Sequence, residues 1–355
     1  MICFRPNVSD CGFFREASTV HSQPVSQDMV WITSSVVTLQ FHVVPPSWNS
    51  RPLEIRCRHF LPRAHEIVIK HVGGRDANRA ITIPAYAAID LGEVKKQLMM
   101  NLRHYCEAFF KESIQPKSTP VVTKTIAMAL HFSSKNETTL VTQALQVWVG
   151  SKLCSTERSL TGLELLGMTS IDDPESHLFG HVPIPPVLDH QCDSMAIEYM
   201  KELTASLLSA ISRKIQAGRR CRNDWFEVFL TIFILLNNLE YVYGIQKTFQ
   251  KYLGSTDKFG SHVKRTSEKY IDKWIWSAEN ILFMYNAFFK NTGAPFSLDT
   301  VDSAIAEGNL DKSGQDYVAE VKRVLPDIKA SARKVSDVTD CNYEMVWCRE
   351  LFIPG

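Results

Sequence analysis

The chain has 355 residues, with 39 lysines and arginines against 38 acidic residues and a formal net charge of +1. A balanced charge without long runs of one sign excludes the strongly basic proteins that follow a phosphate backbone. The length allows one large domain or two intimate ones.

The nine cysteines are scattered along the chain at irregular spacing. A secreted disulfide framework would place an even number of them in a short, dense pattern. We therefore predict reduced thiols in an intracellular protein that is not secreted. The N-terminus agrees with this, because Met1–Phe14 contains Arg5 and Asp10 and has no apolar core of a signal peptide.

The start of the chain does not resemble a packed domain. Residues 1–28 are polar and patternless, and for residues 1–52 we predict a poorly ordered leader or a wrongly assigned start. Within it, Met29–Val44 is rich in β-branched residues and predicts a strand, but no partner pattern places it in a fold. Glu54–Arg56 and Ile67–Ile69 are short strand candidates, so a few short strands are allowed in the first 90 residues.

Helical periodicity begins at Asp90, which with Glu93 has the spacing of a capping box. Apolar residues then recur at spacings of three and four, which is typical of helices with one buried face. A proline-rich loop at 182–187 interrupts this pattern. The helices predicted before the central one cover 90–109, 120–132, 140–153 and 194–216.

The most apolar stretch is Asp224–Leu239, which predicts the buried central helix of the domain. It opens with a second capping-box spacing, Asp224 and Glu227. Glu227, Thr231 and Asn238 fall on one narrow stripe, which we interpret as the wet side of an otherwise surrounded helix. A membrane span is the competing interpretation, and it is disfavoured because the uninterrupted apolar run is far shorter than the roughly 20 residues that cross a bilayer.

The C-terminal third continues in helices. Residues 266–291 form a long amphipathic pattern that Gly293 and Pro295 terminate. Further helices are predicted over 300–306 and 313–335, the second bent or broken at Pro326. The predicted fold class is therefore mainly α, an irregular multi-helix domain over 53–355, with two intimate subdomains meeting near 180–195 as an alternative.

No motif predicts an enzyme, because phosphate-binding, dinucleotide-binding, nucleophile-elbow and zinc-protease signatures are all missing from the sequence. Asp189–Asp193 gathers potential metal ligands, but neighbouring residues rarely converge on one ion, so a polar helix start is the preferred interpretation. Cys341 and Cys348 cannot complete a zinc site by themselves and are better explained as core thiols. We predict no catalytic residue, no metal and no cofactor in this chain.

Two clusters are weighed as contact sites. The concentrated basic patch, with a nuclear-import or phosphate-contact role, consists of Arg213, Lys214, Arg219, Arg220 and Arg222. The competing interpretation is a solvated loop whose arginine stems cover apolar surface. A second cluster of Tyr270, Trp274 and Trp276 could stack on a ligand, although aromatic residues at helical spacing are more often core.

Packing-type motifs recur along the chain at 81–90 (ITIPAYAAID), 162–167 (GLELLG), 183–193, 224–226, 236–240, 277–282 (SAENIL), 293–296 (GAPF) and 347–352. Together they resemble the C-terminal region of fungal zinc-cluster transcription factors, whose DNA-binding module holds two zinc ions with six cysteines. The resemblance covers roughly Leu53–Phe352 and follows the family's order.

The resemblance implies a nuclear regulatory region that acts through protein contacts or by sensing a metabolite, and not an enzyme. The zinc module has no counterpart at the start of the chain, where residues 1–52 contain only Cys3 and Cys11. We therefore expect no direct DNA binding from this chain, no membrane association and partners among other proteins, with a small-molecule effector allowed.

Two alternatives stay open. One is a ligand-binding or catalytic helical protein with a pocket beneath the proline loop and the Trp274 helix, for which a deep pocket with titratable residues would be the sign. The other is a stand-alone partner that pairs with full-length relatives and modulates them, for which an exposed apolar patch on an amphipathic helix would be the sign.

Overall fold

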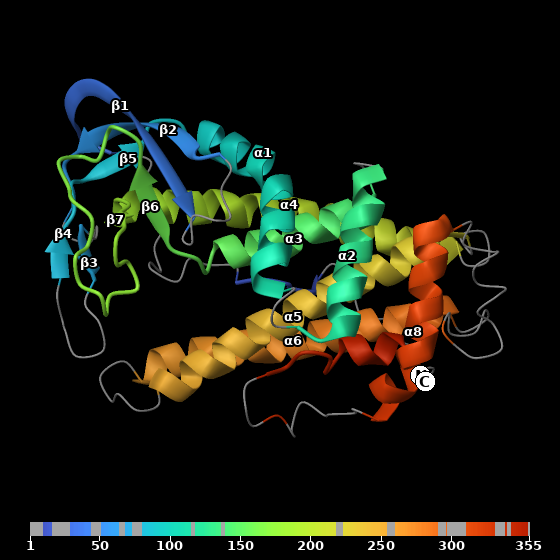
Figure 1. Cartoon of the computed structure of the whole chain (residues 1–355). Coiled ribbons are helices and arrows are strands. Elements are labelled where there is room, and N and C mark those ends of the chain that lie inside the picture. The colour runs from blue at the N-terminus through green and yellow to red at the C-terminus, as the bar shows by residue number, and fades with distance from the viewer. Residues whose placement is uncertain are drawn as a thin grey trace. The chain divides into compact units, whose positions relative to one another are not determined.

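The computed structural model divides into two compact units (Figure 1). Unit 1 contains 1–15, 113–151 and 202–355, and unit 2 contains 16–112 and 152–201. The residues that the structure describes are 10–15, 29–43, 51–63, 68–72, 80–114, 118–135, 139–217, 223–253, 260–289, 296, 310–330, 338 and 342–353.

Unit 2 is built on a five-stranded sheet with the order β5-β2-β1-β6-β7. All its pairings are antiparallel, and the long central strands β1 and β2 pair from Val36 opposite Arg58 to Phe41 opposite Leu53. A separate two-stranded sheet joins β3 to β4. The strands are β1 (Trp31–Val43), β2 (Leu53–Phe60), β3 (Ile69–His71), β4 (Ala80–Thr82), β5 (Tyr86–Ala88), β6 (Arg158–Thr161) and β7 (Val182–Pro183).

One face of this sheet forms the core of unit 2. Leu39 and Phe41 alternate with outward-facing polar residues on β1, as expected for a half-buried strand. They pack with Val94 of α1 (Leu91–Phe109) and with Leu188 of α4 (Pro186–Ala217). The apolar face of the sheet is therefore covered by two helices.

The central place of β1 corrects an expectation. The β-branched residues of 29–44 predict the strand, but local patterns offer no partner for it, and the surrounding leader is expected to be poorly ordered. In the structure it pairs with β2 on one side and, over 40–43, with β6 on the other. The partner β6 lies more than a hundred residues away, and local sequence patterns carry no information on such a pairing.

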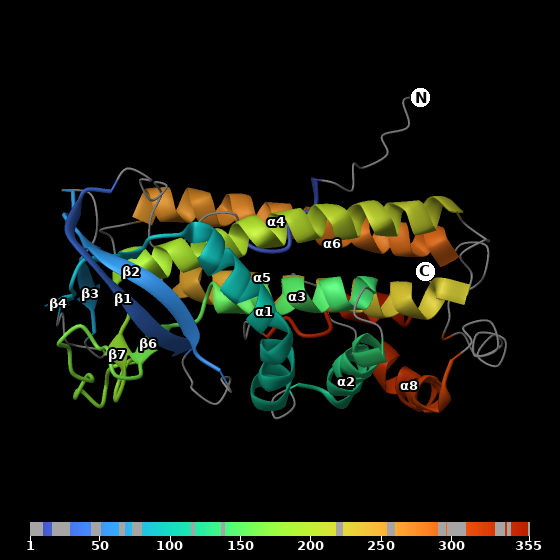
Figure 2. The same cartoon turned by 90° about the horizontal axis from the view of Figure 1, so that it is seen from above.

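Unit 1 is a helical assembly around α5 (Trp225–Leu253). Figures 1 and 2 show α5 side by side with α6 (Gly260–Phe289), and α2 (Pro120–Lys135) beside α8 (Lys312–Ala330). Part of α3 (Leu140–Leu153) also belongs to this unit, and a short 3-10 helix, η6 (Cys348–Leu351), packs on α5.

Aromatic rings fill the interior around α5. Phe229 contacts Phe296 with ring centroids 4.9 Å apart and Phe352 at 5.4 Å, and Tyr317 of α8 lies 6.4 Å away. Edge-to-face and tilted ring pairs of this kind add to the free energy gained from burying their area. The predicted central helix is thus the core of this unit.

The polar stripe of α5 is not wet, which corrects its interpretation. Glu227 accepts a hydrogen bond from the Leu140 amide at 2.9 Å, and Thr231 donates to the Glu227 carbonyl. Asn238 is fully buried, accepts from the Ser151 hydroxyl and donates to the Phe13 carbonyl. These side chains form hydrogen bonds with buried polar groups of neighbouring segments. Polar residues that bond to such neighbours recur along one side of a helix just as water-exposed residues do.

By length and composition, Trp225–Thr248 is the one span among the described residues that could cross a membrane, but 89% of its most apolar window is buried inside the structure. It therefore has the surroundings of a core helix. The prediction had counted the apolar run as too short, whereas α5 continues for 14 residues beyond Leu239. Burial, rather than length, separates the two interpretations.

The other predicted helices lie close to the observed ones, at 91–109, 120–135, 140–153, 260–289 and 312–330. Asp90 accepts from the amides of Gly92 and Glu93, as a capping residue does. Helix α4 starts at Pro186, eight residues before the predicted Ser194, because proline is well suited to the first helical position. Pro326 lies inside α8. The predicted helix 300–306 lies outside the described residues.

The described residues are mainly helical, as predicted, with a sheet larger than the few short strands expected. In place of a capping box at the start of α5, the carboxylates of Asp224 and Glu227 are both paired with Lys214. The proposed boundary between 1–52 and 53–355, and the division near 180–195, stay predictions.

Gly162 follows β6 with a φ of 81°, a backbone conformation that favours glycine, and an added Cβ would collide with the Gln40 side chain. We expect Gly162→Ala to lower the free energy of unfolding by about 1–3 kcal/mol. Gly167→Ala is the matched control, because its φ is 70° but nothing lies within 4 Å of the added Cβ. Chemical denaturation measures both, and equal losses would show that the Gln40 contact contributes nothing.

Candidate functional site: a buried ion-pair network

The densest polar network in unit 2 centres on Arg158, the first residue of β6, whose side chain is 2% exposed. Its guanidinium donates to the Asp189 carboxylate at 2.5 Å, to the Asp193 carboxylate at 2.9 Å and to the Leu153 carbonyl at 3.2 Å. The two aspartates are four residues apart, so they lie on one face of the first turns of α4. The network therefore fixes the start of α4 against the sheet.

The network carries one cation and two carboxylates, so it holds a net negative charge in a dry environment. Burial raises the pKa of Asp193, Arg158 acts in the opposite direction, and the neighbouring Asp189 raises it further. For Arg158 itself, burial would lower the pKa, but the two carboxylates prevail and raise it. The guanidinium is thus permanently charged, and Asp193 is the group in the network that can take up a proton.

Two thiols, Cys154 and Cys192, lie near these charges, and a third, Cys57, lies near Cys192. Burial raises the pKa of Cys192 to about 12 and raises the pKa values of Cys57 and Cys154 as well. A protonated thiol is neither a good nucleophile nor a metal ligand. Among the described residues, no group of three histidine, cysteine or acidic side chains has a geometry that could hold a metal ion.

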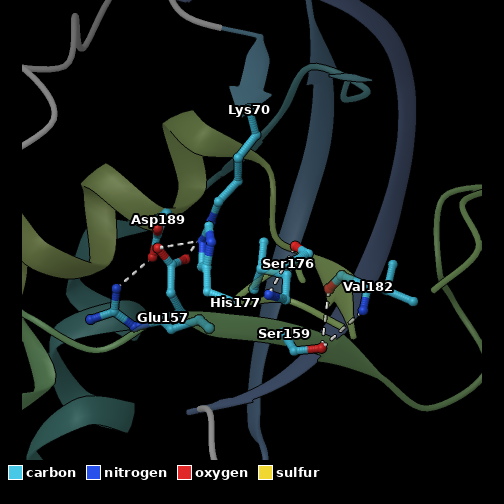
Figure 3. A network of polar contacts seen from close by, with 9 residues as sticks. Lys70, Glu157, Ser159, Ser176, His177, Val182 and Asp189 are labelled. Carbon is cyan, nitrogen blue, oxygen red and sulfur yellow. Dashed lines mark hydrogen bonds and ion pairs between the residues drawn. The ribbon is translucent and has the colours of Figure 1, made fainter. Parts of the chain in front are cut away.

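A second, more exposed layer borders the network (Figure 3). Glu157 pairs with Lys70 at 2.6 Å and with His177 at 3.5 Å, joining β3 to the loop that precedes β7. Ser159 donates to the Val182 carbonyl and accepts from the Val182 amide. These contacts hold the loop between β6 and β7 to the sheet.

The structure explains the polar motif Asp189–Asp193 without a ligand. It lies at a helix start, as predicted, and its outer members bind Arg158. Gln191 accepts from the Ala88 amide at 2.8 Å, which ties α4 to β5 as well. The side chains of Asp189, Gln191 and Asp193 therefore bind other parts of unit 2.

The predicted basic patch is only partly described. Lys214 bridges Asp224 at 2.6 Å and Glu227 at 3.0 Å, and these contacts raise its pKa against the opposing effect of burial. Arg213 is exposed. The remaining members Arg219, Arg220 and Arg222 lie outside the described residues, and a contact role for the patch stays a prediction.

The predicted aromatic cluster and the predicted cysteine pair are also only partly buried or partly described. Trp274 is buried and stacks on Tyr270 with ring centroids 5.7 Å apart, as a core residue would. Trp276, by contrast, is 38% exposed. Cys348 is buried, and its thiol donates to the Phe233 carbonyl. Its predicted neighbour Cys341 lies outside the described residues.

Unit 1 holds a second polar centre, which was not singled out from the sequence. The buried carboxylate of Glu240 accepts from the amides of Met345, Trp347 and Cys348 at 3.0, 2.7 and 2.8 Å. Burial raises the pKa of Glu240 to about 7, and the three amides limit the rise. This carboxylate fastens the C-terminal segment to α5.

Both centres are saturated by the protein itself, and the groups that titrate in them are enclosed by the fold. Their contacts hold segments in place. The comparisons with known proteins show which class of protein the chain resembles. A family model described as KpeA transcription factor matches residues 21–351.

The match covers most of the chain, so the chain falls in a class of transcription-factor-like proteins. It belongs to the KpeA transcription factor family. A similar protein is the satratoxin biosynthesis SC3 cluster transcription factor SAT20 of the fungus Stachybotrys chartarum, 27% identical over 275 residues. That alignment covers 76% of this chain and 38% of the relative, so the chain spans about two fifths of the relative's length. No solved structure matches the chain.

Proposed function

We propose that this chain is the regulatory region of a fungal transcription factor of the zinc-cluster type and works in the nucleus. It acts through contacts with other proteins or by sensing a metabolite, and neither catalyses a reaction nor contacts DNA directly. The observation that carries the proposal is the family match over 21–351, a range in which no cysteine spacing resembles a six-cysteine zinc module.

The structure supports this proposal in two ways. The polar centres around Arg158 and Glu240 are enclosed and serve the fold, as expected of a protein whose work is done by its surface. The chain is also nearly neutral, and Lys214 of the basic patch is engaged by two carboxylates. A surface that binds DNA through phosphates requires several free cations.

A reporter assay tests the proposal. The chain is fused to an unrelated DNA-binding domain and expressed in a fungal host, with that domain alone as the control. We expect the fusion to change reporter output several-fold in either direction, because a regulatory region transfers its effect when it is tethered. In parallel, fluorescence anisotropy with duplex DNA at physiological salt should show no binding beyond the weak non-specific range.

The outcomes separate the parts of the proposal. An unchanged reporter from a folded, nuclear fusion would contradict the regulatory role. Tight DNA binding by the isolated chain would contradict the indirect mode of action. If adding the small-molecule fraction of host extract raises the melting temperature of the purified chain, the metabolite-sensing mode is supported, since a ligand stabilises the state that it binds.

A further inference from the structure

Helix α6 has one face that is exposed in the described part of the chain. Its exposed residues include a row that we call the acidic-aromatic stripe. The stripe consists of Glu268, Asp272, Trp276, Glu279 and Phe283. These positions follow one another at spacings of four, four, three and four, so they form a single line along the helix. The opposite face, with Trp274, Ala278 and Ile281, is buried in unit 1.

The two aromatic members of the stripe are both exposed. Trp276 is 38% exposed and Phe283 is 60% exposed. Single exposed apolar residues are common and need no explanation. Here, however, the two rings are seven residues apart, which is two helical turns or roughly 10 Å along one face. That is the repeat with which one helix recognises another.

The acidic members give the stripe a charge. Glu268, Asp272 and Glu279 make no ion pair with any residue in the described part of the chain. Lys269 is an exposed cation beside the first of them but lies about 100° away around the helix. The stripe runs carboxylate, carboxylate, aromatic, carboxylate, aromatic. This order matches a partner helix that offers cationic and apolar side chains along one face.

The same charges oppose pairing with a second copy of this chain. A two-fold antiparallel arrangement of α6 that brings Trp276 onto Phe283 of the other copy has its centre between 279 and 280. This arrangement would place Glu279 of one chain next to Glu279 of the other chain, and the two carboxylates would repel each other. A basic helix instead brings cations to the carboxylates and can place one over the Trp276 ring, which attracts cations through its quadrupole.

We propose that the acidic-aromatic stripe is a docking surface for a basic amphipathic helix of a partner protein. Apolar side chains of that helix pack on Trp276 and Phe283, and its lysines or arginines pair with Asp272 and Glu279. The proposal rests on the proposed function in one respect, since it names the chemistry of a partner for a regulator that works through protein contacts.

Two designed peptides test this surface with the purified full-length chain. Both are fluorescein-labelled helices of about five turns with the same leucine face, and they differ only in flanking residues, arginine in one and glutamate in the other. We expect the arginine peptide to bind, with affinity that falls as salt is raised, and the glutamate peptide to bind at least about tenfold more weakly. Fluorescence anisotropy measures both.

Variants assign the binding to the stripe. The double variant Trp276→Ala and Phe283→Ala should lower the affinity for the arginine peptide about tenfold or more, because two aromatic contact residues are lost. The charge reversals Asp272→Lys and Glu279→Lys should invert the preference between the two peptides. Asp316→Lys is the matched control, because this exposed carboxylate of α8 lies off the stripe, and it should change affinity less than about twofold.

Equal affinities for the two peptides, or unchanged affinity in the stripe variants, would overturn the proposal. So would self-association in sedimentation experiments that the Trp276→Ala and Phe283→Ala pair abolishes, since the stripe would then be a contact between copies. Because the peptide measurement uses no reporter gene, a failure here with an active tethered fusion contradicts the docking surface alone. A silent fusion contradicts the regulatory role whatever the peptides do.

Discussion

Replacing Arg158 by alanine should lower the free energy of unfolding by roughly 3–5 kcal/mol, the range for breaking a buried ion pair from one side. The substitution leaves Asp189 and Asp193 facing each other without their cation, and Asp193 is already the group whose pKa burial raises. It also removes one of the two donors of the Leu153 carbonyl, which keeps only the Thr156 amide. Urea unfolding followed by circular dichroism measures the loss in the transition of unit 2.

A matched control comes from the same sheet. Arg56 also pairs with a carboxylate, Glu93 at 3.0 Å, but its side chain is 54% exposed. Exposed pairs contribute about 0–1 kcal/mol, so Arg56→Ala should be nearly neutral. The triple variant Arg158→Met, Asp189→Asn and Asp193→Asn removes the charges together and should recover part of the loss. If Arg158→Ala matched Arg56→Ala, the network would have no special role in stability.

The helices could be predicted because the buried face of each helix appears in the sequence as apolar residues at spacings of three and four. The spacing of apolar residues placed α1, α2 and α3 within a few residues of their observed ends. The sheet could not be predicted in the same way. Strand β6 is four residues long and pairs with β1 across more than a hundred residues, so neither its pattern nor its length distinguishes it from a loop.

The polar centres were predicted least well, for a related reason. The pair Asp189 and Asp193 has the i, i+4 spacing of a shared target, which is a usable signal, but nothing in the sequence identifies Arg158 as that target. Glu240 lies within a motif that was quoted for the family resemblance, yet its partners are backbone amides about a hundred residues away. Any sequence supplies backbone amides, so they leave no pattern to find.

Replacing Glu240 by alanine should cost about as much as losing Arg158. Three amides lose their acceptor in a buried place, and each orphaned donor costs roughly 1–3 kcal/mol, partly offset by removal of the buried charge. Met345 favours release of the segment, because its φ of 64° is a strained conformation that its contact with Glu240 helps to hold and that can relax once this contact is lost. We expect the C-terminal segment to detach, which hydrogen exchange at Trp347 and Cys348 would detect as lost protection.

Replacing Glu240 by glutamine removes the titratable group but keeps a similar shape, so the pH dependence of stability reports the effect of the charge alone. The pKa of Glu240 is about 7 in the folded protein and about 4.5 when unfolded. The folded state therefore binds the extra proton between these values, so this contribution to stability is fully present below about pH 4.5 and is lost as the pH rises through about 7. The slope is at most about 1.4 kcal/mol per pH unit for one proton. Because the folded protein has lost half of this proton at pH 7, the total change from pH 5.5 to 7 is roughly 1.6 kcal/mol.

We expect Glu240→Gln to remove this slope from the free energy of unfolding while keeping an acceptor for two of the three amides. Glu320→Gln is the control with the opposite sign. Two cations lower the pKa of that exposed carboxylate to about 2, so its contribution is present above about pH 4.5 and is lost only below the tested range. An unchanged slope in Glu240→Gln would mean that Glu240 is ionised throughout. In that case the three amides would lower the pKa of Glu240 by more than burial raises it. The C-terminal segment would then be bound to an ionised carboxylate at every pH tested.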